Sequence, residues 1–261
     1  MRASRPHGDP QMNIVACVKR VPVTEAQAVV AASGTSLDPS GYQYMLSFYD
    51  EIAVEEAVKT KERLGGEVTV LTLGPAESSK ELRECLAKGA DKAMVLADPT
   101  WGERDALATA KILAAQLKSM GAELVFCGRT ATDRDNSAVG QMVATLLGWA
   151  CVTEVSGLEL GEGKGTAKRE TESGIETLEF PLPAVITCNK GLNEPRYAGL
   201  KGIMAAKKKP IEEVAFEAPA NQAAAVKMEL PAPRKEGRIV GQGVDAVGPL
   251  IEALRNEAQV L

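Results

Sequence analysis

Short apolar runs alternate with stretches of helical periodicity between Asn13 and Trp149, and this alternation is the strongest constraint on the fold. Parallel strands joined by helices produce such a pattern, because each strand is buried on both faces and each helix crosses back over the sheet. We predict strands at 14–18, 68–73, 93–96 and 124–127, and helices at 50–64, 78–88, 105–120 and 137–147. The sequence therefore predicts an α/β fold with a doubly wound, mostly parallel, Rossmann-like sheet.

After Trp149 the apolar runs become shorter and are separated by turns; they lie at 152–160, 166–172, 175–180 and 184–188. We interpret them as antiparallel strands that extend one edge of the sheet within a single domain, 13–212. The segment 213–261 predicts an extended C-terminal arm that ends in a helix. That helix has an apolar stripe for packing on a partner chain or on its own domain, formed by Val247, Leu250, Ile251 and Leu254.

Composition argues against several classes of function. The only histidine, His7, lies in a polar leader, 1–12, that we expect to be disordered, with Met12 as an alternative start, so a histidine base or zinc ligand is not expected. The five cysteines are widely spaced and lack a C-x-x-C pair, which favours buried thiols in a reducing compartment, the cytoplasm, over a metal site or a disulfide framework. A net charge of -5 argues against general nucleic-acid binding. No apolar run approaches the roughly 20 residues that span a bilayer.

Two loops mark the most favourable place for a ligand. In an open parallel sheet, ligands bind beyond the carboxyl ends of strands where the strand order reverses, and the loops after the first and fourth predicted strands are expected to flank such a point. In the second of these loops, Asn136 or Ser137 is expected to cap the next helix, whose N-terminal amides suit a phosphate. Asp133 and Asp135 are candidates for ribose hydroxyls or for the helix dipole. Neither a G-x-G-x-x-G nor a Walker motif is present.

A second candidate site is the segment 193–204, which combines apolar side chains with Pro195, Gly199 and Gly202. This content of proline and glycine predicts a surface loop rather than a helix. Its apolar residues are therefore candidates for docking on a partner, and an ordinary connector is the equal alternative.

Two acidic pairs do not indicate acid–base catalysis, because neither has a concave apolar context in the sequence. Glu55 and Glu56 are interpreted as a solvated face of the helix at 50–64. The second pair is Glu170 and Glu172, and Glu170 lies beside Arg169 on a predicted strand, where an ion pair is as plausible as a general acid.

Segments spread along the chain match one pattern when they are taken together. They are V-K-R-V-P at 18–22, D-E-I-A-V-E-E-A at 50–57, G-P-A at 74–76, G-A-D at 89–91, the loop 128–141, R-E at 169–170, P-A-V at 183–185 and L-N-E-P-R-Y at 192–197. Each segment alone is weak, but in combination they are specific. Over residues 13–261 the chain resembles the β subunit of electron transfer flavoproteins.

The resemblance implies a heterodimer. An α subunit would hold a redox FAD, and this chain would hold a nucleotide in an adenine-nucleotide-binding fold, with the arm 213–261 packed on the α subunit. The protein would be an electron carrier rather than a stand-alone enzyme. It would accept electrons from acyl-CoA or related dehydrogenases, as in fatty acid oxidation, and pass them to the respiratory chain or another acceptor.

The resemblance also assigns residues by position. The docking loop falls on 193–205, with Leu200 as the anchor and Arg196, Tyr197 and Met204 as further contacts with the dehydrogenase. Glu170 matches an acid thought to help set the mobility of the flavin domain. No metal ligand is implied. The nucleotide site falls on Cys17, Ser47, Phe48, Tyr49, Asp50, Leu73, Gly128, Arg129, Ala131, Asp133, Asn136, Ser137, Ala138 and Val139.

The identity of the nucleotide stays open. Thr24 and the closing segment 255–261 match electron-bifurcating members, which use NADH and carry a second FAD in this subunit, whereas Gln141 departs from them. We place AMP slightly ahead of FAD. A non-redox module that binds AMP or ATP is the alternative from another class.

Overall fold

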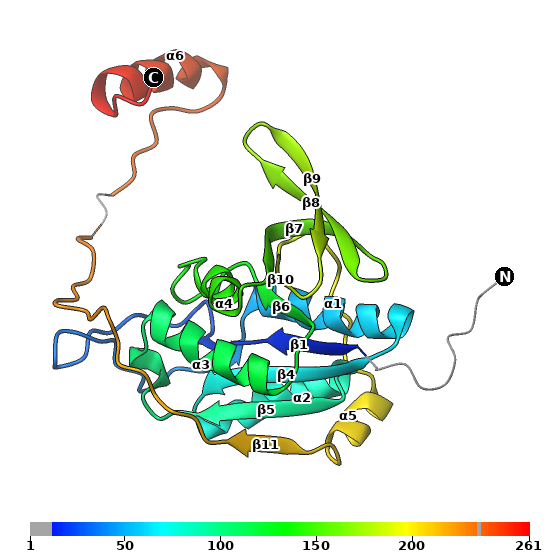
Figure 1. The fold of residues 1–261 in the computed structure, drawn as a ribbon. Coiled ribbons are helices and arrows are strands. Elements are labelled where there is room, and N and C mark those ends of the chain that lie inside the picture. Colours follow the sequence, from blue (N-terminus) through cyan, green and yellow to red (C-terminus); the bar gives the residue numbers. More distant parts are fainter. Residues whose placement is uncertain (1–11, 234–235) are drawn as a thin grey trace.

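A nine-stranded sheet forms the centre of the computed structural model, which describes residues 12–233 and 236–261 (Figure 1). Neighbouring strands run parallel from β11 to β7, and only the last two pairings are antiparallel. In sheet order the strands are β11 (Ile211–Val214), β5 (Lys92–Ala97), β4 (Glu67–Gly74), β1 (Asn13–Cys17), β6 (Leu124–Gly128), β10 (Ala184–Cys188), β7 (Ala150–Leu160), β8 (Lys164–Thr171) and β9 (Gly174–Pro181).

Helices cover both faces of the parallel part. On one face, Ile52 of α1 and Leu82 of α2 pack with Ile14 of β1 in a buried apolar cluster. On the other face, Leu113 of α3 and Val143 of α4 pack with residues of β1, β4 and β6 in a second cluster. The predicted doubly wound α/β fold is confirmed. The helices are α1 (Phe48–Leu64), α2 (Ser79–Lys88), α3 (Ala106–Ser119), α4 (Val139–Leu147), α5 (Leu200–Ala206) and α6 (Val247–Glu252).

Shorter elements complete the chain. A separate hairpin pairs β2 (Arg20–Pro22) with β3 (Tyr44–Leu46). Tight 3₁₀ turns lie at η1 (Ala76–Ser78), η2 (Trp101–Glu103) and η3 (Val244–Ala246), and a wider π-helical turn lies at η4 (Ala253–Glu257). None of the described helices is long and apolar enough to cross a membrane.

The strand order reverses between β1 and β6. From β1 the chain moves outward to β4 and β5, and then returns to pair β6 on the opposite side of β1. This arrangement confirms the expected position of the switch point, because the loops after β1 and β6 emerge side by side at the carboxyl edge.

The prediction of an antiparallel edge strand at 184–188 was wrong. β10 lies inside the sheet, parallel to both β6 and β7, and all five of its residues are buried. A strand covered on both faces has a continuous apolar run, and short runs of this kind do not reveal the direction of pairing. The antiparallel edge is confirmed for β7, β8 and β9.

The prediction that the docking segment forms no helix was wrong. Its residues Leu200–Ala206 form α5, which packs on the surface of α2. Gly202 permits the contact, since a Cβ atom there would lie 2.3 Å from the carbonyl oxygen of Ala87. The glycine that argued against a helix in the sequence is therefore the residue that lets this helix pack closely.

The C-terminal arm leaves the domain after β11, and its final helix lies away from the sheet (Figure 1). The helix predicted at the end of the arm is short and irregular, with α6 between η3 and η4. Val247, Leu250 and Ile251 are exposed. In the part of the chain that the structure describes, the sheet and its helices leave these three side chains of the apolar stripe uncovered. Residues 1–11 of the predicted leader lie outside the described residues.

Replacing Gly202 with alanine should destabilise the protein by about 1–3 kcal/mol, because the added methyl group meets the α2 backbone. Gly248→Ala, also in a helix but with open space around the glycine, should be neutral or slightly stabilising. Urea unfolding of both variants tests the packing; equal stability of Gly202→Ala and the unmodified protein would contradict it.

Candidate functional site

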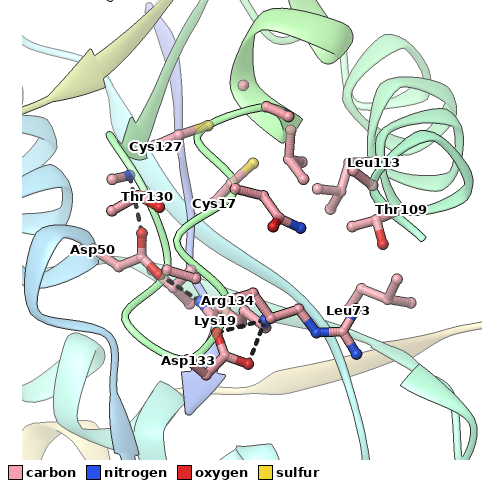
Figure 2. A pocket seen from close by; sticks show the side chains of 18 of the residues that line it. Cys17, Lys19, Asp50, Leu73, Thr109, Leu113, Cys127, Thr130, Asp133 and Arg134 are labelled. Carbon is pink, nitrogen blue, oxygen red and sulfur yellow. Dashed lines mark hydrogen bonds and ion pairs between the residues drawn. The ribbon is translucent and has the colours of Figure 1, made fainter. Parts of the chain in front are cut away.

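The carboxylate of Asp50 joins the ends of the two strands at the switch point. Asp50 lies in the first turn of α1, and its Oδ2 accepts the backbone N–H of Lys19, just after β1, at 2.7 Å. Its Oδ1 accepts the backbone N–H of Gly128, at the end of β6, at 2.9 Å. Two neighbouring strand ends are thereby held in a fixed relation by a single buried side chain (Figure 2).

Gly128 is required by this contact. A Cβ atom on Gly128 would lie 2.4 Å from Oδ1 of Asp50 and 2.8 Å from Cβ of Tyr49. Any larger residue would push the carboxylate away from the strand end.

Burial raises the pKa of Asp50 to about 7, although its two backbone hydrogen bonds oppose the shift. Desolvation disfavours the charged form, whereas donated hydrogen bonds favour it, and here desolvation is the larger effect. The carboxyl group consequently titrates in the neutral range.

A pocket of about 1050 Å³, including its open mouth, lies at this edge between the β1 and β6 loops and α3. Cys17, Cys127, Leu73 and Leu113 give it an apolar wall, and Thr109 faces it from α3 (Figure 2). Such a mixture of a flat apolar wall and a few polar groups is typical of ligand sites.

Cationic side chains line the opposite part of the pocket. Lys19 pairs with Asp133 at 2.7 Å, and burial lowers the pKa of Lys19. Arg134 donates to the carbonyl oxygens of Arg104, at 3.0 Å, and Gly102. These contacts tie the loop after β6 to the loops after β1 and β5. Together the cations make the pocket suitable for an anion.

Arg129 offers a further donor. Its Nη1 lies 3.3 Å from Glu154, and its guanidinium lies 5.3 Å from the ring centroid of Tyr49. Its buried Nε has no hydrogen-bond partner among the described residues. Buried donors are normally satisfied, and this Nε is an exception in a residue that lines the pocket.

The predicted helix cap was wrong. α4 begins at Val139, and its N-cap is Ala138, which has no side-chain acceptor. Asp135 and Ser137 adopt left-handed backbone conformations, with φ of 51° and 47°, so the loop makes an extra turn before the helix starts. Asn136, Ser137 and Ala138 line the pocket from this turn instead.

Most residues that we predicted for the nucleotide site line this one pocket. They are Cys17, Asp50, Leu73, Gly128, Arg129, Ala131, Asp133, Asn136, Ser137, Ala138 and Val139. Ser47, Phe48 and Tyr49 are not among the lining residues. Ser47 is fully buried at the start of α1, and its N–H donates to the carbonyl oxygen of Lys19 at 3.0 Å. Phe48, the next residue, is exposed, so the predicted contact of these three residues with the nucleotide is not seen in the pocket lining.

Sequence reasoning missed the side of the pocket that follows β5. It is formed by Trp101, Gly102, Arg104, Ala106, Thr109 and Leu113. The sequence could have indicated this side, because the segment lies between a predicted strand and a predicted helix, and the carboxyl ends of all parallel strands meet at one edge of the sheet. Within the described residues, no group of three or more His, Cys, Asp or Glu side chains could hold a metal ion.

The second candidate site is an exposed apolar surface that we call the docking patch, formed by Tyr197, Leu200, Ile203 and Met204. Tyr197 is 98% exposed and Leu200 is 77% exposed. Single exposed apolar residues are common, but a contiguous group of them indicates an interaction surface.

Glu170, the further candidate from the sequence, lies on β8 and is exposed.

The interpretation of Glu55 and Glu56 as a solvated face was wrong, because both are buried. The segment before the docking patch covers them: Arg196 pairs with Glu55, and Asn193 donates to Glu56. Helical periodicity cannot reveal cover that comes from a distant segment of the chain.

The fold and the site define an α/β protein with a doubly wound sheet and a partly apolar, partly cationic pocket at the switch point, which is where proteins of this class bind their ligands. The model of the electron transfer flavoprotein domain matches residues 36–219. The chain belongs to the electron transfer flavoprotein family.

Relatives match over nearly the whole chain. Electron transfer flavoprotein subunit beta of Bacillus subtilis is 32% identical over 259 residues, covering 96% of this chain and 100% of the relative. The subunit beta of Bradyrhizobium diazoefficiens is 37% identical over 253 residues, with the same coverage. A caffeyl-CoA reductase-Etf complex subunit, CarD of Acetobacterium woodii, is 40% identical over 202 residues, 77% of each chain.

The pKa of Asp50 predicts a pH dependence of stability. The ordinary value, 3.8, applies to the unfolded chain and the value near 7 to the folded one, so the folded state holds the proton more tightly between them. The stability that Asp50 contributes is then complete below about pH 4 and is lost as the pH rises to about 7. Asp50→Asn should remove this part of the pH profile of the unfolding free energy. Parallel profiles for the two proteins across that range would contradict the assignment.

Proposed function

We propose that this chain is the β subunit of a heterodimeric electron transfer flavoprotein and that its pocket holds an adenine nucleotide. One observation carries the proposal: the pocket lies at the β1–β6 switch point, within a chain that matches β subunits over nearly its full length. The protein carries electrons and needs no acid or base of its own for that task.

The lining residues fit such a ligand. Leu73 and Leu113 provide an apolar surface for a purine, and Asp133 is within the pocket to accept hydrogen bonds from ribose hydroxyls. Lys19, Arg129 and the unsatisfied start of α4 supply positive potential for a phosphate. A bound nucleotide would contact the loops after β1, β5 and β6 together and so would stabilise their arrangement.

An α subunit that carries the redox FAD is the proposed partner of the C-terminal arm, 213–261. The exposed stripe of Val247, Leu250 and Ile251 supports this assignment, because a helix with an open apolar face is stable when it packs on another surface. Glu170, exposed on β8, is proposed to influence the mobility of the flavin domain.

The docking patch is proposed to hold the electron donor, an acyl-CoA or related dehydrogenase, while the flavin domain moves close enough for transfer. Leu200 would be the anchor, since it combines high exposure with a position at the start of α5. The respiratory chain or another acceptor would then receive the electrons.

A second FAD in place of AMP is the second candidate for the pocket. Thr24 favours it, because this residue matches the electron-bifurcating members, whereas Gln141 favours AMP. We place AMP slightly ahead.

The ratio of flavin to heterodimer distinguishes the two candidates. Coexpression with the α subunit, followed by acid release of the nucleotides, should give about one FAD and one AMP per heterodimer, since the redox flavin resides in the α subunit. About two FAD would establish the second candidate instead. A colourless chain that binds AMP but forms no flavin complex would replace the proposal with a non-redox nucleotide-binding module.

Leu200→Ala should leave the flavin content intact and lower the rate at which a dehydrogenase reduces the heterodimer by about tenfold, because a buried anchor residue contributes more than about 1 kcal/mol to an interface. Leu146→Ala is the matched control: Leu146 is 46% exposed and lies on α4, on the opposite face of the sheet from α5. Equal rates for the two variants would contradict a docking role.

A further inference from the structure

Arg196 lies immediately before the docking patch, but its guanidinium faces its own domain. Its Nε and Nη2 donate to the carboxylate of Glu55, each at 2.9 Å. Its Nη1 and Nη2 donate to the carboxylate of Glu62, at 2.6 and 3.0 Å. Both acids are on α1, one near its middle and the other near its end. Two bidentate pairs therefore use four of the five N–H donors of this guanidinium.

The backbone of Arg196 and the side chain of Asn193 also bind to α1. The backbone N–H of Arg196 also donates to Glu55, at 3.1 Å. Three residues earlier, the amide of Asn193 donates to the carbonyl oxygen of Ile52, at 3.1 Å, and to Glu56, at 2.9 Å. We call this set of contacts, from Asn193 and Arg196 to α1, the α1 clamp.

The buried carboxylates of Glu55 and Glu56 need the hydrogen bonds of the α1 clamp to offset their loss of hydration. Glu55 is 5% exposed and Glu56 is 7% exposed, and buried carboxylates are costly without donors. The hydrogen bonds from Arg196 hold the pKa of Glu62 below its ordinary value. If the Arg196 guanidinium moved away, the buried carboxylate of Glu55 would lose its cationic partner. This cost favours a single position of the segment around Arg196.

A second fixed point lies beyond the patch. Gly202 contacts the backbone of Ala87, and the Arg83 guanidinium donates to the carbonyl oxygen of Ala206 at 2.6 Å. The exposed side chains of Tyr197 and Leu200 thus lie between two anchored ends. Such a segment loses little conformational entropy when a partner binds.

We infer that Arg196 is a positioning residue, which holds the docking patch in its binding orientation through Glu55 and Glu62 before the partner arrives. The resemblance implied a contact between Arg196 and the dehydrogenase; in this inference Arg196 instead acts on the partner through the patch and makes no contact with it. This inference rests on the proposed docking function and refines it, because it separates the residues that touch the dehydrogenase from the residue that prepares them.

Arg196→Lys tests the inference in the intact heterodimer. Lysine keeps the charge but cannot form two bidentate pairs. Amide hydrogen exchange within 197–206 should become about tenfold faster or more, as expected when local opening becomes easier. The KM for the heterodimer in reduction by an acyl-CoA dehydrogenase should rise about fivefold, with kcat and flavin content unchanged.

Two control variants make the result specific. Arg63→Lys makes the same substitution on an exposed arginine of α1 outside the α1 clamp and should change neither measurement. Glu62→Gln, which weakens only the exposed pair, should give a smaller change in the same direction.

The outcomes separate the inference from the proposed function. If Leu200→Ala raises the KM while Arg196→Lys changes neither the KM nor the exchange rate, docking stands and the positioning role is wrong. If Arg196→Lys raises the KM without faster exchange, the arginine contacts the partner directly, and the inference is also overturned. If Leu200→Ala has no effect, the docking function itself fails.

Discussion

The buried carboxylate of Asp50 is the contact on which the organisation of the carboxyl edge depends. A parallel sheet brings the ends of β1 and β6 to one edge, but it does not fix the loops that leave them. Asp50 fixes both at once, through the backbone N–H groups of Lys19 and Gly128. Because the carboxylate comes from α1 rather than from either strand, the strand ends, the helix and the pocket wall form one rigid unit.

α1 also connects the two candidate sites. Its first turn carries Asp50, and its later turns carry Glu55 and Glu62, which hold Arg196 before the docking patch. The helix therefore supports the pocket at one end and the α1 clamp along its length. In the proposed division of roles, the pocket holds the nucleotide, the patch selects the dehydrogenase, and the C-terminal helix joins the α subunit.

The sequence predicted those features that follow from periodicity. The alternation of strands and helices led to the doubly wound sheet and the switch point, and the loop 128–139 was placed at the pocket. Features that depend on contacts between distant segments were not predictable: the parallel insertion of β10, the burial of Glu55 under Arg196, and the close approach of α5 to α2 at Gly202. The extra turn before α4 was missed because Asp135 and Ser137 adopt left-handed conformations, which propensity does not favour.

In the proposed function, the contact between Asp50 and Gly128 shapes the adenine-nucleotide site. The most direct measurement is a calorimetric titration of AMP into the nucleotide-free heterodimer, with the unmodified protein and Gly128→Ala side by side. We expect about one site per heterodimer and an affinity at least about tenfold lower in the variant, because the added methyl group displaces the carboxylate. Equal affinity in both proteins, or no binding to the unmodified one, would contradict the account.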